Sequence, residues 1–331
     1  MKRVFTAAIA MFTVFLGNAQ QDAQFSQNMF LNDAINSGAA GIKGMHCFNL
    51  VARDQWTGFE GNPFTGQFSY NGPVRSVENL GLGAVLVFDE LGFTQNVNLK
   101  VNAAYHLSLG KGKLGLGLGL GMLNKSFAGN IIASNPNDAI ILGINDQAGM
   151  GLDLGFGAFY YVPETLYFGI SGQKLIGQKL KLGSANPKIR QHLYITGGYY
   201  YPVNPKKSIV LKPNFLVKTD FSSTQMDVNL TAEFKLPSDK SFWIGASYRV
   251  QDAIVANVGY NIKPNLKLGL AYDFTTQNLR KEGTFTLWKE NGSSESINNN
   301  RSVGSVELYL GYCFITPPKP IFKQYVDPLF L

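Results

Sequence analysis

Residues capable of acid–base, nucleophilic or metal chemistry are few and scattered in this 331-residue sequence. The candidates with the most versatile side chains are His46, His106, His192, Cys47 and Cys313. They do not form the closely spaced His/Cys cluster of a metal site, and no calcium-loop motif is present. A catalytic site needs a nucleophile, a base and an orienting group at one place. An enzyme would have to use Asp89-Glu90, the one acidic pair at the end of a predicted strand. We therefore expect no catalytic residue, no metal and no cofactor.

The elements that must position these residues are strands with two different faces. In "KLGLGLGLGM", residues 113–122, leucine and glycine alternate, so a strand would carry leucine on one face and nothing on the other. A helix would contain four interior glycines, which is unfavourable. Similar alternation recurs in fourteen segments, most of them about ten residues long, which suits a tilted strand crossing a bilayer. We expect strands over 46–53, 63–71, 80–89, 95–109, 112–125, 150–162, 164–174, 190–201, 207–219, 225–236, 240–250, 252–262, 264–276 and 305–315.

The connections between these segments fall into two classes. Those that follow even-numbered segments are all short, and five of the six contain proline. The three long connections, 126–149, 175–189 and 277–304, all follow odd-numbered segments. Short turns at one end and long loops at the other are typical of outer-membrane barrels. We therefore predict an all-β protein, a transmembrane antiparallel β-barrel of about 14 strands at 46–315, with leucines toward lipid and periplasmic termini. A soluble β-sandwich is the alternative.

Composition and the N-terminus indicate an exported protein. Charged residues make up only 15% of the chain and aromatic residues 13%. Residues 1–19 read as a secretory signal peptide, with a basic start, a short apolar core and a small-residue cleavage site before Gln20. Removing Lys2 and Arg3 lowers the formal net charge from +7 to +5. No Lys/Arg cluster with interleaved aromatics occurs, so we expect no nucleic-acid partner.

The inward face of the predicted barrel has a smooth glycine wall and a polar wall. Glycine admits close approach of another backbone, so Gly115, Gly117, Gly119 and Gly121 are candidate partner-binding residues. Alternatively, the glycines leave room for inward aromatics or ease curvature. The polar wall includes Lys100, Lys212 and Lys218, and these inward lysines also allow a passive porin for small solutes.

Three features lie at the margins of the barrel. Cys47 and Cys313 fall on the first and last predicted strands, which barrel closure pairs, so a disulfide between them is possible, with two small buried hydrophobes as the alternative. Residues 20–45 do not alternate and would form a periplasmic or lumenal segment. Residues 316–331 are proline-rich and form either a disordered tail or a periplasmic contact for a partner, with Tyr325 as a candidate.

Two spaced motifs give the chain a family resemblance. The runs "QDAQFSQNMFLNDAINSGAAG" (21–41) and "RDQWTGFEGNPFTGQFSYNGPV" (53–74), with the ending "SVELYLGYCF" (305–314), resemble the PorP/SprF family of type IX secretion membrane proteins. Ser37 stands where the family has proline, and Ala39 where it often has tyrosine. These departures concern the conformation of the turn at 36–41 and do not affect the expected fold. The matching residues of the opening runs are Gln21, Asp22, Gln24, Phe25, Ser26, Gln27, Gln55, Trp56, Gly58, Gly61 and Pro63.

The resemblance implies an outer-membrane protein of Gram-negative bacteria with type IX secretion, some of which show gliding motility. Family members act with secreted adhesins that carry a particular C-terminal domain, and one member is coupled to a periplasmic peptidoglycan-binding protein. None is known as an enzyme. We therefore expect a barrel that binds the C-terminal domain of an adhesin and aids its secretion or anchors it at the surface. Trp56 and Phe59, in the first outward loop, are candidate anchors.

Overall fold

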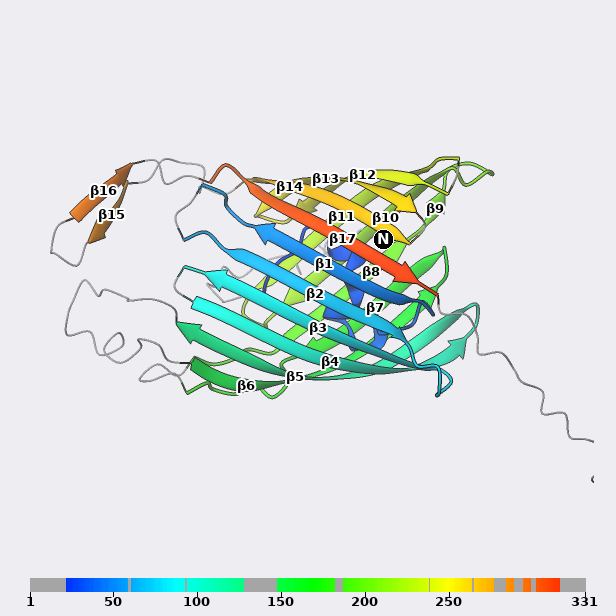
Figure 1. Cartoon of the computed structure of the whole chain (residues 1–331), viewed down its shortest axis with the longest axis horizontal. Coiled ribbons are helices and arrows are strands. Elements are labelled where there is room, and N and C mark those ends of the chain that lie inside the picture. Colours follow the sequence, from blue (N-terminus) through cyan, green and yellow to red (C-terminus); the bar gives the residue numbers. More distant parts are fainter. Residues whose placement is uncertain are drawn as a thin grey trace, which may run out of the picture.

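The computed structural model is a closed antiparallel β-barrel (Figure 1). It describes residues 22–58, 61–92, 94–127, 148–181, 187–237, 239–263, 265–276, 284–288, 294–298 and 302–315. Within them, fourteen strands form the wall, and β10 and β11 pair to close it. The wall strands are β1 His46–Asp54, β2 Phe64–Pro73, β3 Leu80–Leu91, β4 Thr94–Leu109, β5 Gly112–Phe127, β6 Ala148–Val162, β7 Leu166–Gln173, β8 His192–Tyr199, β10 Ile209–Thr219, β11 Thr224–Lys235, β12 Ser241–Arg249, β13 Ala253–Lys263, β14 Leu266–Thr275 and β17 Ser305–Phe314.

Three short strands lie outside this set of fourteen. β9 Tyr201–Pro202 continues the pairing of β8 with β10 at the short-turn end. β15 Thr284–Trp288 and β16 Ser294–Asn298 pair with each other beyond the opposite end of the barrel (Figure 1). No helix within the described residues is long and apolar enough to cross a membrane.

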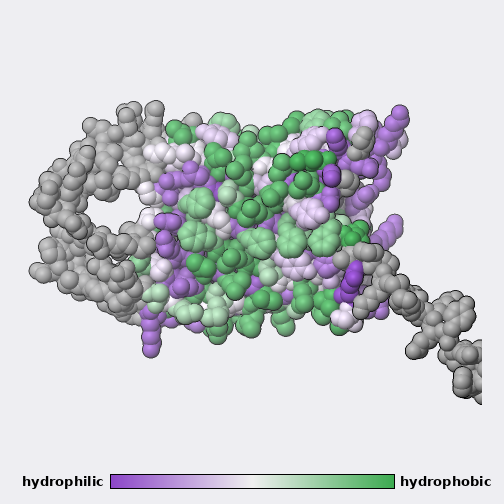
Figure 2. Space-filling model, viewed as in Figure 1, coloured by the Kyte–Doolittle hydropathy of each residue, from purple (hydrophilic) through white to green (hydrophobic). Residues whose placement is uncertain are grey.

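The alternation seen in the sequence orients each strand. Along β5, Leu118 and Leu120 are 62% and 63% exposed on the outside, while Gly117 and Gly119 between them are buried. The outer surface in Figure 2 shows the same pattern, with a hydrophobic middle and hydrophilic residues toward both ends. A closed barrel satisfies every backbone hydrogen bond of a wall that faces lipid. The predicted fourteen-stranded barrel is therefore confirmed.

Turn chemistry differs between the two ends. β4 and β5 are joined by the two-residue turn Gly110-Lys111, with Leu109 opposite Gly112. Gly110 has a φ of +58°, and glycine at the first central position suits a tight hairpin of this kind. We call this the short-turn end. The other end, at which β5, β7 and β14 finish and β6, β8 and β17 begin, is called the long-loop end.

Candidate functional site

The N-terminal segment lies inside the barrel. Residues 22–45, here called the plug, contain three short helical turns, η1 Asn28–Phe30, α2 Asn32–Ile35 and η2 Ser37–Ala39. The plug begins with Asp22 beside Lys174 and Lys218, at the long-loop end, and leads into His46 at the short-turn end. A barrel of this strand number is wider than the small barrels whose own side chains fill the interior. The plug therefore occupies the part of the lumen that the wall side chains do not fill.

The glycine wall is where the plug packs most closely. A Cβ placed on Gly38 would lie 2.5 Å from the Gly115 carbonyl oxygen and 2.9 Å from that of Gly157. A Cβ on Gly117 would collide with the backbone of Ser37 and lie 2.5 Å from the Gly38 nitrogen. The glycines therefore form a groove for a backbone, and its occupant is this chain's own η2 turn.

The remaining candidate glycines have other neighbours. A Cβ on Gly119 would lie 2.9 Å from the Ser37 Oγ and 2.6 Å from the Asn102 Oδ1. Gly121 faces the adjacent strand, because a Cβ there would lie 2.6 Å from the Leu99 oxygen and 3.0 Å from the Lys100 Cα. Elsewhere, glycines make room for inward aromatics, as the alternative interpretation predicts: Gly259 lies against Trp243.

Wall side chains satisfy the carbonyl groups of the irregular plug. The Lys100 ammonium donates to the Ala34 carbonyl at 3.0 Å, and the Asn102 amide donates to the Asp33 carbonyl at 3.2 Å. His106 Nε2 lies 2.9 Å from the Ala40 carbonyl oxygen. Buried carbonyls without a partner are costly, so these inward residues specify the path of the plug.

A buried ionic cluster holds the plug at Ser26. Arg53 of β1 pairs with Asp273 at 2.8 Å, and Arg249 of β12 pairs with the same carboxylate at 3.0 Å. Arg53 lies directly across from Glu307 in the β1–β17 register. Both arginine residues are only 1% exposed. Buried charges need close partners and hydrogen bonds, and each of these four side chains has them.

Ser26 lies among these four charges. Its Oγ accepts from Arg53 Nη1 at 2.6 Å and donates to Asp273 Oδ1 at 2.6 Å. Its backbone N–H donates to one Glu307 oxygen at 2.6 Å, and that of Gln27 donates to the other at 2.8 Å. The cluster therefore recognises two consecutive residues of the plug. Ser26 and Gln27 belong to the opening run of the family, the one sequence signal that could have located this contact.

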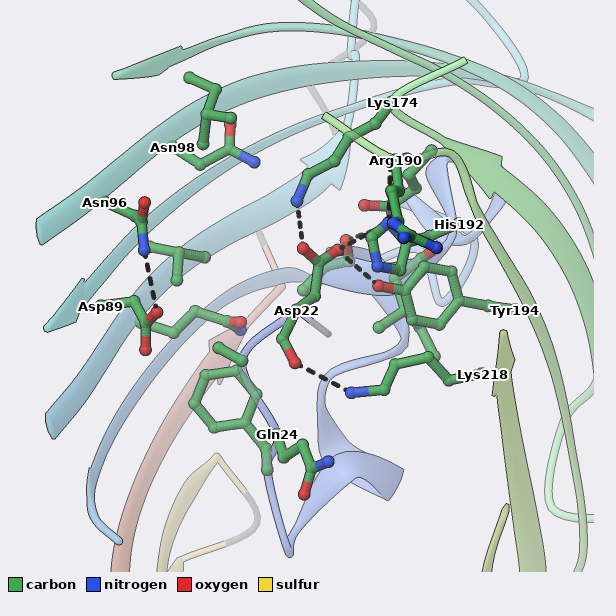
Figure 3. Close-up of a pocket in the computed structure, with 18 of the residues that line it drawn as sticks. Asp22, Gln24, Asp89, Asn96, Asn98, Lys174, Arg190, His192, Tyr194 and Lys218 are labelled. Carbon is green, nitrogen blue, oxygen red and sulfur yellow. Dashed lines mark hydrogen bonds and ion pairs between the residues drawn. The ribbon is translucent and has the colours of Figure 1, made fainter. Parts of the chain in front are cut away.

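Asp22 occupies a cationic cage at the long-loop end (Figure 3). Its carboxylate forms an ion pair with Lys174 and accepts from the Tyr194 hydroxyl at 2.8 Å, and His192 Nδ1 lies 3.7 Å away. The Lys218 ammonium donates to the Asp22 backbone carbonyl at 2.9 Å. Burial raises the pKa of Asp22, but the positive charges of Lys174, His192 and Lys218 outweigh burial and hold that pKa well below its ordinary value.

An open cavity of about 890 Å³ lies above this cage, between the plug and the long-loop ends of the strands. Of the two predicted anchor residues, Trp56 lines the cavity and donates its backbone N–H to the Ser305 hydroxyl at 3.0 Å. Phe59 and Tyr325 lie outside the described residues, as do the predicted signal peptide and proline-rich tail. The partner-binding role of the predicted residues stays a prediction.

Cys47 and Cys313 form a disulfide. They are directly opposite in the β1–β17 register, close to the short-turn end. The bond therefore covalently joins the first and last strands at the seam of the barrel. Among the described residues, no group of three or more His, Cys, Asp or Glu side chains could hold a metal ion.

The fold and the plugged lumen define an outer-membrane β-barrel. The family model of the type IX secretion system membrane protein PorP/SprF matches residues 17–288. The chain belongs to this family, and the predicted resemblance is confirmed. None of the curated proteins compared with the chain matches it.

Solved structures resemble this chain only in their general shape. The outer membrane protein Omp33 of Acinetobacter baumannii is 8% identical, with 82% of this chain and 99% of that one covered and a TM-score of 0.43. The toluene transporter TbuX of Ralstonia pickettii is 12% identical, with 86% and 92% covered and a TM-score of 0.46. A TodX mutant, a monoaromatic hydrocarbon channel, is 10% identical, with 93% and 98% covered and a TM-score of 0.47.

Proposed function

We propose that this barrel binds the C-terminal domain of a type IX-secreted adhesin at its long-loop end and aids the secretion of that adhesin or anchors it at the cell surface. The observation that carries the proposal is the position of the plug, whose η2 turn packs backbone to backbone against Gly115 and Gly117. Because the plug fills the lumen beside these glycines, the packing favours a barrel that binds a partner over one that passes solutes. The cavity of about 890 Å³ leaves room for a partner at the end with the long connections.

The same proposal assigns the partners and the orientation. The long-loop end faces the outside of the cell and the short-turn end faces the periplasm, as the loop asymmetry of outer-membrane barrels suggests. The short-turn end would contact other type IX secretion components or a periplasmic peptidoglycan-binding protein. The barrel acts without catalysis.

Site-specific photo-cross-linking tests the proposal. A photoreactive phenylalanine analogue replaces Trp56 at the cavity, and a matched control replaces Tyr201, which is exposed at the short-turn end. Both variants carry a C-terminal tag and are irradiated in living cells. We expect a large exported protein cross-linked through position 56 and absent from position 201.

Recovery of the barrel without an exported protein at position 56 would overturn the proposal. The passive porin then becomes the first alternative, and it requires steady open conductance steps in a planar bilayer. If only periplasmic proteins are cross-linked, the barrel is secretion machinery tied to the cell wall.

A further inference from the structure

The cavity at the long-loop end has two chemically different sides. One side carries the ammonium and imidazole groups of Lys100, Lys174, His192 and Lys218. Figure 3 shows the last three of these around Asp22. The other side is apolar and is lined by Val85, Val87, Leu123, Leu180 and Ile189. A ligand that reaches both of these sides would combine negative charge with apolar groups.

Three carboxylates, those of Asp22, Asp89 and Asp227, also line the cavity. Asp89 accepts from the Thr65 hydroxyl and Asp227 pairs with Arg249, so the ammonium groups of the lining are only partly paired. Lys174 has the Asp22 carboxylate as its ion-pair partner. Lys100 and Lys218 are only 3% and 4% exposed, and each donates to a single plug carbonyl, Ala34 or Asp22. Neither forms an ion pair with a described residue within 4.0 Å. An ammonium group has three donors, and a buried charge without a counter-charge is costly.

A further polar atom beside the cavity lacks a partner. Gln67 of β2 is 3% exposed, and its side-chain Nε2 has no hydrogen-bond partner among the described residues. The residue lines the cavity together with Lys100 and Lys218. Buried donors are ordinarily satisfied, so this amide points to a ligand with acceptor oxygens.

We propose that the cavity binds an acidic, apolar peptide segment of the secreted partner, with the carboxylates of that segment near Lys100 and Lys218 and its apolar side chains against Val85 and Leu123. This inference rests on the proposed function, which brings a protein to this end of the barrel. Asp22 shows what the cage accepts, because its own carboxylate is already held there by Lys174 and the Tyr194 hydroxyl.

Peptide binding to the full-length barrel in detergent tests the proposal. The probe is a fluorescein-labelled nonapeptide of three Gly-Leu-Glu repeats, and its control is the same peptide with glutamine in place of glutamate. Fluorescence anisotropy measures both. Because a charge-assisted hydrogen bond is stronger than a neutral one, we expect the glutamate peptide to bind about tenfold more tightly at low salt. The preference should shrink as salt is added.

Variants assign the preference to the cavity. Lys100→Met and Lys218→Met should each reduce it, and Lys218→Arg should retain it because the charge remains. The matched control is Lys212→Met, which lies on the same strand as Lys218 but at the short-turn end, where it pairs with Glu233. Heat-dependent migration on gels checks that each barrel is folded, and the charge-conserving arginine variant keeps the test decisive if a methionine variant fails to fold.

The possible outcomes separate this inference from the proposed function. Equal binding of the two peptides, or an unchanged preference in folded Lys100→Met and Lys218→Met barrels, would overturn the inference. If an exported protein is still cross-linked at position 56 in that case, the proposed function stands without it. A preference lost in these variants, with no exported protein cross-linked in cells, would support the site and refute the adhesin-binding role.

Discussion

Gly38 of the plug lies against Gly115 of β5 so closely that a Cβ added to Gly38 would come within 2.5 Å of the Gly115 carbonyl oxygen. Neither backbone can move away easily, because Gly38 is in a helical turn and Gly115 is hydrogen-bonded in the barrel wall. Two glycines far apart in the sequence thus determine how deeply the plug is seated.

Substitution of the glycine groove should destabilise the protein. In a strand, Gly→Ala is ordinarily stabilising by roughly 0.5–1 kcal/mol. At Gly117 the new Cβ would collide with the Ser37 backbone, so we expect Gly117→Ala to cost about 1–3 kcal/mol. The control is Gly66→Ala, whose Cβ would have nothing within 4 Å. Thermal unfolding in detergent measures the effect: relative to wild type, we expect a lower midpoint for Gly117→Ala and no lower midpoint for Gly66→Ala. Equal midpoints would show that the groove is not tightly packed.

Loss of the Ser26 hydroxyl should loosen the start of the plug. In Ser26→Ala, Arg53 and Asp273 each lose a hydrogen bond of 2.6 Å inside a buried cluster, and we expect a loss of about 1–3 kcal/mol. Ser26→Asp should be worse, because it adds a negative charge beside Asp273 and Glu307. Ser108→Ala, at an exposed site on β4, serves as control. Protease cleavage within residues 22–36 measures the release. A plug that stays protected in Ser26→Asp would contradict the assigned role.

The Asp22 cage should weaken in acid. The pKa of Asp22 is held below its ordinary 3.8 in the folded protein. A carboxyl group with a depressed pKa stabilises the fold fully above its unfolded pKa, and the contribution is lost as pH falls from there toward the folded value. We expect wild type to be more stable than Asp22→Asn at pH 7 and the difference to shrink as pH falls below 3.8. The thermal unfolding midpoints of both proteins, measured from pH 7 to pH 3, test this. A difference in midpoint that does not change with pH would show that the Asp22 carboxylate is not held in the cage.

The seam disulfide should contribute to stability under oxidising conditions. Cys47 and Cys313 are 266 residues apart in the sequence, so the bond restricts the unfolded chain strongly, and its removal should cost about 2–4 kcal/mol. Denaturant midpoints of wild type and Cys47→Ser, each with and without reductant, measure the effect. Reductant should lower the midpoint of wild type and leave the variant unchanged. If wild type is also insensitive, the bond does not stabilise the seam.

The strands could be predicted closely because one physical demand repeats along the chain. Each crossing needs an apolar face toward lipid and a different face inward, and the period of two makes this visible in the sequence. The expected strand 112–125 is β5 Gly112–Phe127, and the expected strand 252–262 is β13 Ala253–Lys263. The pairing of β15 with β16 was not predicted, because it lies inside a long connection.

The lumen was harder to predict because no period governs it. Residues 22–45 lack alternation, and their path is specified by individual wall donors such as Lys100 and Asn102. Close approach of another backbone was one of two interpretations of the glycine wall, and the sequence did not indicate that this backbone is that of Ser37 and Gly38. Likewise, Arg53, Asp273 and Glu307 meet only after the barrel closes.

The plug should also decide whether the barrel conducts. In planar bilayers we expect wild type to show little current, because residues 22–45 cross the lumen and pack against β5 without space for a methyl group. Deleting residues 22–36 should give open steps, since it removes the part of the plug bound by Glu307, Lys100 and Asn102 while leaving the wall strands intact. Deleting residues 316–331, which follow the last wall strand in the sequence, provides a control. Large steady steps in wild type would favour the porin, because a passive pore for solutes needs a lumen that is open without any deletion.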